Sequence, residues 1–261
     1  MSGFLVAQQT RIQVMTPKIE QLPGLKLNVD AMDSGSMFQE SARLTRAGIG
    51  DPVGGVLQPS GNHASQTVTA AKPTRAIGWN GLPVLSFDGG DYLICDWLAA
   101  SAGVSGSDKP FTVVAVLKFS AVGAIRQILT FGRAATNNTL RMCGVSSFPA
   151  WFFYSVDDAD GENGSTGGTP DTSPHVVCFL FSGMTVSILI DGVTVANETV
   201  HNLGVNTLDQ ATIGAQRTFG ALTQFMLGVI GQLAVLNRRI SNDEAKFATH
   251  LFGAKWGIVT L

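Results

Sequence analysis

Residues 111–119 constrain the fold more than any other stretch of the chain. In this segment, FTVVAVLKF, the odd positions from Phe111 to Phe119 are all apolar, whereas the even positions are mixed. A period of two places successive side chains on opposite faces of a β-strand. The segment therefore predicts a strand with one fully buried face and one partly covered face.

Further segments predict neighbours for this strand. Residues 175–181 are an almost continuous apolar run, and residues 184–190 alternate up to Asp191-Gly192, a strong signal for a two-residue hairpin turn. Other β-prone runs are residues 25–30, 84–87, 127–131, 140–144, 150–156, 211–215 and 227–236. We therefore expect an all-β fold of antiparallel strands.

One convincing helix is expected near the end of the sequence. Ser241 is suited to cap its start, and Glu244 completes a capping box. Gly253 is expected to end it, because glycine readily adopts the left-handed conformation that terminates helices.

Composition limits the classes of partner. Charged residues make up 14% of the 261-residue chain, compared with roughly 25% in an average soluble domain. This deficit fits a large sandwich whose surface is partly covered by other subunits, and it favours a homo-oligomer. The formal net charge of −2 gives no electrostatic footprint for nucleic acid. No apolar run is long enough to insert across a bilayer.

The cysteines and the first residues indicate where the protein folds. Cys95, Cys143 and Cys178 are far apart and lie in apolar surroundings, so we expect buried free thiols and folding in a reducing cytoplasm. Residues 4–7 are too short an apolar run for a signal peptide, and no basic segment precedes them.

Residues 1–21 are predicted to form an extended arm that precedes a single domain over residues 22–261. The arm is richer in apolar side chains than a disordered tail, and we expect it to add a strand to the sheet edge of a neighbouring subunit. The alternative is a frayed terminus. The candidate assembly residues are Phe4, Leu5, Val6, Ile12, Val14 and Met15.

Several motifs carry a family resemblance that extends from about Leu22 to Ile258. They are DPVGGVL at 51–57, SGNHA at 60–64, AKP at 71–73, NGLPVLSFDG at 80–89, FTVV at 111–114, IDG at 190–192, IG at 213–214 and GQLAVLNRRIS at 231–241. Together they resemble concanavalin A-like/laminin-G-like jelly rolls of the kind found in bacteriophage particle proteins and bacterial surface proteins. The resemblance implies a two-sheet antiparallel jelly-roll sandwich, a fold that lectins, hydrolases, adhesins and virion proteins share.

The aromatic run Trp151-Phe152-Phe153-Tyr154 supplies candidate binding residues. In a strand, Trp151 and Phe153 share one face, and Phe152 and Tyr154 share the other. At least one pair is expected in the core. The other pair either packs simply or forms a platform on which a sugar stacks, for which Trp151 and Tyr154 are the candidates.

The acidic, Gly-rich segment 157–174 is expected to be a solvated loop. Its carboxylates, with Asp157, Asp158 and Asp160 as candidates, have the oxygen ligands that Ca²⁺ prefers. The EF-hand pattern fails, because the sixth position counted from Asp158 is Asn163 and the twelfth is Thr169. A calcium site is therefore the less favoured interpretation.

Catalytic motifs are missing from the sequence. It has no HExxH motif and no GxSxG nucleophile elbow. It also lacks the Glu-x-Asp-x-x-Glu pattern by which some glycosidases with a jelly-roll fold place their catalytic carboxylates on one strand. We therefore expect a non-enzymatic protein. With the resemblance, this implies a structural protein of a bacteriophage particle, made in the host cytoplasm and displayed on the head or tail. It would be anchored by its arm to other virion proteins and would aid adhesion to host surface glycans. The alternatives are a carbohydrate-binding module and a polysaccharide-degrading enzyme.

Overall fold

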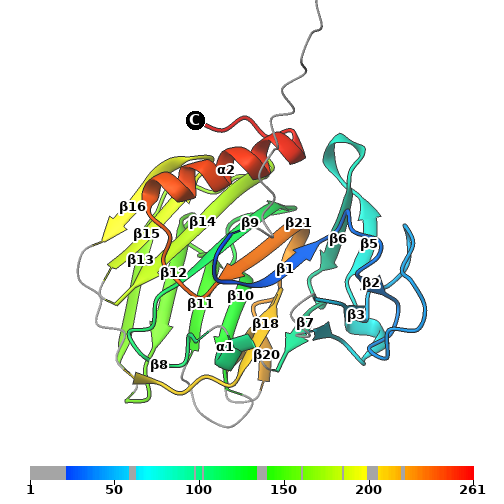
Figure 1. The fold of residues 1–261 in the computed structure, drawn as a ribbon, viewed down its shortest axis with the longest axis horizontal. Helices are drawn as coiled ribbons and strands as arrows, with labels where there is room; N and C mark the ends of the chain where they lie inside the picture. The colour runs from blue at the N-terminus through cyan, green and yellow to red at the C-terminus, as the bar shows by residue number, and fades with distance from the viewer. Residues whose placement is uncertain are drawn as a thin grey trace, which may run out of the picture.

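A computed structural model describes residues 22–58, 63–96, 98–101, 103–133, 140–159, 161–183, 185–198, 205–218 and 221–261. The predicted arm residues Phe4, Leu5, Val6, Ile12, Val14 and Met15 lie outside these ranges. Within the described ranges, two antiparallel sheets pack face to face (Figure 1). The predicted all-β jelly-roll sandwich is confirmed.

Sheet A contains the predicted strand at its centre. Its order is β16 (Val193–Glu198), β15 (Thr185–Ile190), β14 (His175–Ser182), β9 (Phe111–Phe119), β21 (Leu227–Leu236), β6 (Pro83–Asp88) and β5 (Thr74–Ile77), with β1 (Leu25–Asp30) also paired to β21. The hairpin at Asp191-Gly192 joins β15 and β16 as predicted.

Sheet B runs in the order β13 (Glu162–Gly167), β12 (Trp151–Val156), β11 (Leu140–Val145), β10 (Arg126–Gly132), β18 (Gln210–Ile213), β7 (Leu93–Cys95), β4 (Ala64–Ser65), β3 (Gly55–Val56) and β2 (Met37–Phe38). Two small pairs join β8 (Gly106–Ser107) to β17 (Val205–Asn206) and β19 (Gln216–Thr218) to β20 (Ala221–Thr223). The helices are α1 (Leu98–Ser101) and α2 (Asn242–Trp256), with single 3-10 turns at Thr69–Ala71 and Trp79–Gly81.

The alternation of β9 divides its side chains between two layers. The odd residues are buried between the sheets, where the ring of Phe111 lies 5.4 Å from that of Phe131 and 5.3 Å from that of Phe181. The even residues Val114 and Val116 belong to a separate cluster with Ala245, Phe252 and Trp256 of α2. The partly covered face is therefore the one that the helix packs on.

The capping box of α2 forms as predicted, but the expected end of the helix is wrong. The Ser241 hydroxyl accepts a hydrogen bond from the Glu244 amide, and the Glu244 carboxylate accepts one from the Ser241 amide. The helix continues past Gly253 to Trp256 and ends at Gly257, which has a φ of 67°. A Cβ at Gly253 would lie 2.8 Å from the Ile258 carbonyl oxygen. Gly253 therefore allows the tail to pack closely and does not end the helix.

The segment 157–174 is not a simple loop, which corrects a second expectation. Its residues 162–167 form β13, which pairs along its whole length with β12 at the edge of sheet B. The glycines that favoured a loop allow close packing, because a Cβ at Gly167 would lie 2.3 Å from the Val195 carbonyl oxygen.

The three cysteines agree with the sequence-based expectations. Cys95, Cys143 and Cys178 are all buried and unpaired, as predicted. No helix in the described ranges is long and apolar enough to cross a membrane.

Candidate functional site

The outer face of sheet B carries an apolar cluster that is separate from the core between the sheets. Leu140, Met142, Phe152 and Val156 form it, with Ile125 and Tyr154 packed against them. The cluster arises from the alternation of β11 and β12, whose other residues point into the sandwich.

Glycines lie beside the two outward-facing aromatic residues of β12. Phe152 is paired with Gly144 of β11, and Tyr154 is paired with Gly164 of β13. A Cβ at Gly144 would lie 2.1 Å from the Arg126 carbonyl oxygen, so no larger residue fits there. On their other sides, Phe152 is paired with Thr166 and Tyr154 with Met142. Phe152 is buried, with 6% of its surface exposed, whereas Tyr154 stays half-buried and is the more accessible of the two rings.

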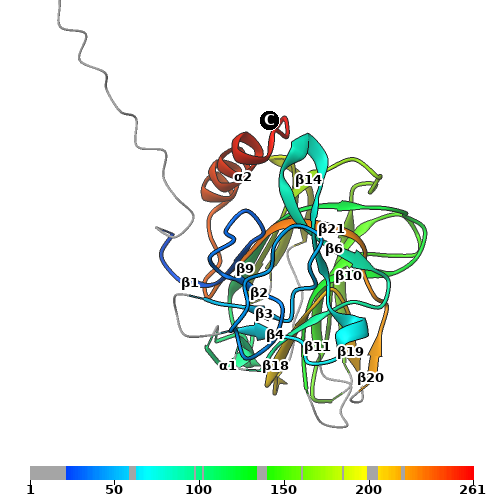
Figure 2. The same ribbon diagram turned by 90° about the vertical axis from the view of Figure 1, so that its right-hand side faces the viewer.

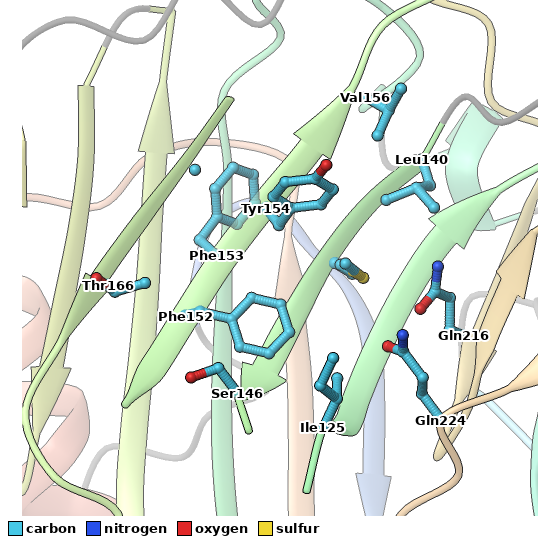
Figure 3. Close-up of a pocket in the computed structure, with 12 residues that line it drawn as sticks. Ile125, Leu140, Ser146, Phe152, Phe153, Tyr154, Val156, Thr166, Gln216 and Gln224 are labelled. Atoms are coloured by element: carbon cyan, nitrogen blue, oxygen red, sulfur yellow. The ribbon is translucent and has the colours of Figure 1, made fainter. Parts of the chain in front are cut away.

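A pocket of about 440 Å³ opens over this cluster (Figure 3). Its apolar lining includes Ile125, Leu140, Met142, Phe152, Tyr154 and Val156, and its polar lining is Ser146, Thr166, Gln216 and Gln224. Figure 3 shows the rings of Phe152 and Tyr154 over β12, with Gln216 and Gln224 along the opposite wall. The volume lies within the range of roughly 300–1,000 Å³ that is usual for small-molecule sites.

The wall opposite the rings comes from the β19–β20 hairpin, which packs on β10. The Gln127 side-chain amide donates to Gln224 Oε1 at 2.7 Å, which directs the Gln224 amide nitrogen elsewhere. Gln216 Nε2 donates to the Thr218 hydroxyl at 2.6 Å. Its Oε1 atom is buried and has no hydrogen-bond partner within the described residues. The Gln224 amide nitrogen is therefore the wall group left to donate, whereas Gln216 Oε1 is an unsatisfied acceptor that is covered in this structure.

Tyr154 is a half-buried member of the lining. Burial and a hydrogen bond to the Glu162 carboxylate raise the pKa of the Tyr154 hydroxyl above its ordinary value. The hydroxyl is therefore protonated near neutral pH, and the ring can take part in neutral, amphipathic contacts.

The structure places the two predicted platform residues on opposite faces of β12. Tyr154 lines the pocket, and its contact with sugar remains a prediction. Trp151 is 1% exposed and packs edge-on against His175 inside the sandwich, with ring centroids 5.8 Å apart. Its assignment to an exposed platform was wrong, because its position in the alternation points it into the core.

The two described calcium candidates are already hydrogen-bonded within the protein. Asp157 accepts hydrogen bonds from the amides of Ala159 and Gly161, and Asp158 accepts them from the amide and hydroxyl of Thr207. Asp160 lies outside the described residues. Within those residues, no group of three or more His, Cys, Asp or Glu side chains is placed to hold a metal ion.

Sequence reasoning missed part of the site. The place of Phe152 beside Tyr154 was implied by the alternation of residues 151–154, but Phe152 was not singled out. Gln216 and Gln224 carried no local signal, since only the folding of the hairpin over sheet B brings them to the aromatic residues.

Comparison with known proteins identifies the class. The family model described as the concanavalin A-like lectin/glucanases superfamily matches residues 87–246, more than half of the chain. The protein belongs to this superfamily. No curated protein sequence matches the chain.

Solved structures share the fold at low sequence identity. The CBM40 of the Ruminococcus gnavus IT-sialidase, bound to α2,3-sialyllactose, is 14% identical with a TM-score of 0.54, covering 64% of this chain and 96% of that one. The Trypanosoma rangeli sialidase is 14% identical with a TM-score of 0.54, and the match covers 89% of this chain but 33% of the sialidase. The leech intramolecular trans-sialidase is 14% identical with a TM-score of 0.52, covering 64% of this chain and 27% of the enzyme. At this identity the likeness extends to the fold alone.

Proposed function

We propose that this protein is a non-enzymatic glycan-binding protein that uses the pocket on the outer face of sheet B. The observation that carries the proposal is that the half-buried ring of Tyr154 and the side-chain amides of Gln216 and Gln224 line one pocket. An aromatic ring stacks on the apolar face of a sugar, and side-chain amides both donate to and accept from its hydroxyl groups. Few other ligands present an apolar face ringed by hydroxyl groups.

Two further observations support binding without catalysis. The residues that line the pocket include no Asp or Glu, whereas glycoside hydrolysis ordinarily uses two carboxyl groups that flank the scissile bond. The fold is also shared with a carbohydrate-binding module whose structure has been solved with a bound sialyllactose. A binding module is therefore favoured over a polysaccharide-degrading enzyme.

A glycan array probed with the full chain tests the binding function. We expect at least one class of glycan to bind, and the Tyr154→Ala variant to lose about fivefold or more in affinity, since one stacking contact contributes about 1 kcal/mol or more. Phe247→Ala is the matched control, because Phe247 is 48% exposed on α2, away from the pocket. An array without any bound glycan, repeated with added Ca²⁺, would contradict the proposal.

The setting that we propose is the surface of a bacteriophage particle, on its head or tail. The protein would be made in the host cytoplasm and assembled with other virion proteins and further copies of itself. The motifs that resemble phage jelly rolls and the charged fraction of 14% support this setting. The pocket would then hold glycans of the host surface.

Deletion of residues 1–21 tests the proposed arm. We expect the shortened protein to fold, with an unchanged far-ultraviolet circular dichroism spectrum, and to bind particles that lack the protein several-fold less than the full chain does. Binding at full occupancy without the arm would remove the anchoring role and leave glycan binding unaffected.

A further inference from the structure

We infer that the pocket selects uncharged sugars and discriminates against sialylated ones. This inference rests on the proposed glycan-binding function and names its ligand class. It starts from the lining, in which every described side chain is apolar or neutral and polar. A sialic acid carries a carboxylate, and proteins usually bind carboxylates with arginine or lysine.

Three arginines adjoin lining residues in the sequence. Arg141, between Leu140 and Met142, is fully buried and donates to the Asn206 side chain and to the carbonyl oxygens of Val104 and Gly106. Arg126 follows Ile125, but its Nη1 atom donates to the Phe225 carbonyl oxygen at 3.1 Å. Arg217 follows Gln216 on β19, and successive side chains of a strand point to opposite sides. Arg217 lies next to Gly132: a Cβ built on Gly132 would be 3.9 Å from the Cβ of Arg217. None of the three arginines is among the residues that line the pocket.

An exposed carboxylate lies beside the pocket, although it is not part of the lining. The Glu162 carboxylate is hydrogen-bonded to the Tyr154 hydroxyl, beside the ring that we expect to stack on the sugar. A ligand carboxylate at the same ring would meet a like charge, and the lining residues include no Lys or Arg to offset it, which lowers its affinity.

The polar groups of the pocket match neutral hydroxyl groups. Gln216 Oε1 is a buried acceptor with no partner among the described residues, which is energetically unfavourable. A ligand hydroxyl reaches this atom only when the Gln216 side chain turns toward the pocket. Gln224 Oε1 is already engaged by Gln127, so its amide nitrogen is the group left to donate. A sugar hydroxyl donates to one and accepts from the other, whereas a carboxylate only accepts.

The test compares matched neutral and sialylated glycans on the full chain. An array carrying neutral oligosaccharides and their sialylated counterparts, with lactose and 3′-sialyllactose as one such pair, is followed by titration calorimetry of the strongest neutral binder and its sialylated form. We expect the neutral glycan to bind at least about tenfold more tightly. Gln216→Ala and Gln224→Ala are expected to weaken it about three- to tenfold each, and Phe247→Ala to leave it unchanged.

An added cation provides the converse test. Gln224→Arg places a guanidinium at the wall, so we expect it to narrow the preference for the neutral glycan by raising the affinity for the sialylated one. Sialylated glycans that bind the wild-type chain as tightly as neutral ones would overturn the inference and leave the proposed function standing. Neutral binding that Gln216→Ala and Gln224→Ala leave unchanged would also overturn it. An array on which nothing binds would overturn both.

Discussion

The two outer faces of the sandwich both carry apolar residues, but the chain covers only one of them with a helix. On sheet A, Val114, Val116 and Leu180 lie beneath Phe252 and Trp256 of α2 in one buried cluster. On sheet B, the outward-facing cluster around Phe152 lines a pocket. Figure 2 shows α2 and the β19–β20 hairpin on opposite sides of the molecule. The comparison indicates which apolar surface stabilises the fold and which is left for a ligand.

Trp256 is the centre of the covered face. Its ring lies 5.5 Å from that of Trp79, and its carbonyl oxygen accepts hydrogen bonds from the Trp79 indole and from Asn80. The ring fills the space above Gly231, where a Cβ would come within 2.8 Å of it. Such close packing leaves no room for a ligand, in contrast to Tyr154 of β12, which stays half-buried at the pocket.

Removal of the indole should have the largest effect on stability. We expect Trp256→Ala to lower the free energy of unfolding by about 3–5 kcal/mol, because it removes a fully buried aromatic side chain and leaves a cavity. Urea unfolding followed by circular dichroism measures the change, with Phe247→Ala as a surface control on the same helix. In the folded fraction, affinity for glycan should be unchanged. A loss of affinity would show that the two faces are coupled, and it would contradict the separate roles assigned to them.

Overpacking the same contact should have a smaller effect. Gly231→Ala places a methyl group against the Trp256 ring, and we expect a loss of about 1–3 kcal/mol in unfolding free energy. Gly90→Ala is the matched control, because a Cβ there meets its nearest neighbour, Asp88 Oδ1, at an ordinary 3.5 Å. Equal stability of the two variants would mean that the helix docks more loosely than the contact implies.

The two faces should also differ in their response to pH. His175, at the start of β14, lies 2.7 Å from the Asp191 carboxylate and 3.0 Å from that of Asp171. Burial alone would lower the pKa of His175, but the hydrogen bonds to these carboxylates raise it above 6.5. The charged imidazole therefore stabilises the protein below pH 6.5, and this contribution is lost as the pH rises through the raised pKa.

This pH dependence should belong to the interior at the start of β14, where the His175 ring packs against Trp151, and to its partner Asp191, whose carbonyl oxygen accepts a hydrogen bond from the Leu261 amide at 2.8 Å. We expect the melting temperature to fall between pH 6 and pH 9, and the fall to shrink in Asp191→Asn. Glycan affinity should stay constant over that range, since the pocket lining contains no group that titrates there. A melting temperature that rises with pH would contradict the assignment to His175.

The contrast between the faces also marks the limit of what could be predicted from the sequence. The alternation of residues 111–119 and 151–154 correctly separated inward from outward positions, and Ser241 and Glu244 located the start of the helix. The pattern could not tell which outward face α2 would cover, because that depends on contacts between Trp79 and Trp256, which are far apart in the chain. Trp151 was misassigned for a related reason, since either aromatic pair of the run satisfied the period-two rule.

The smallest expected effect concerns a single oxygen atom in the open pocket. We expect Tyr154→Phe to change the affinity for the strongest neutral glycan by less than about threefold, because the hydroxyl is engaged by Glu162 and the ring remains able to stack. Titration calorimetry measures this, with Tyr154→Ala as the paired variant that removes the ring. A loss in Tyr154→Phe as large as that in Tyr154→Ala would mean that the hydroxyl itself contacts the ligand. The sugar would then lie nearer to Glu162, and the discrimination against carboxylates should be stronger than the neutral lining alone implies.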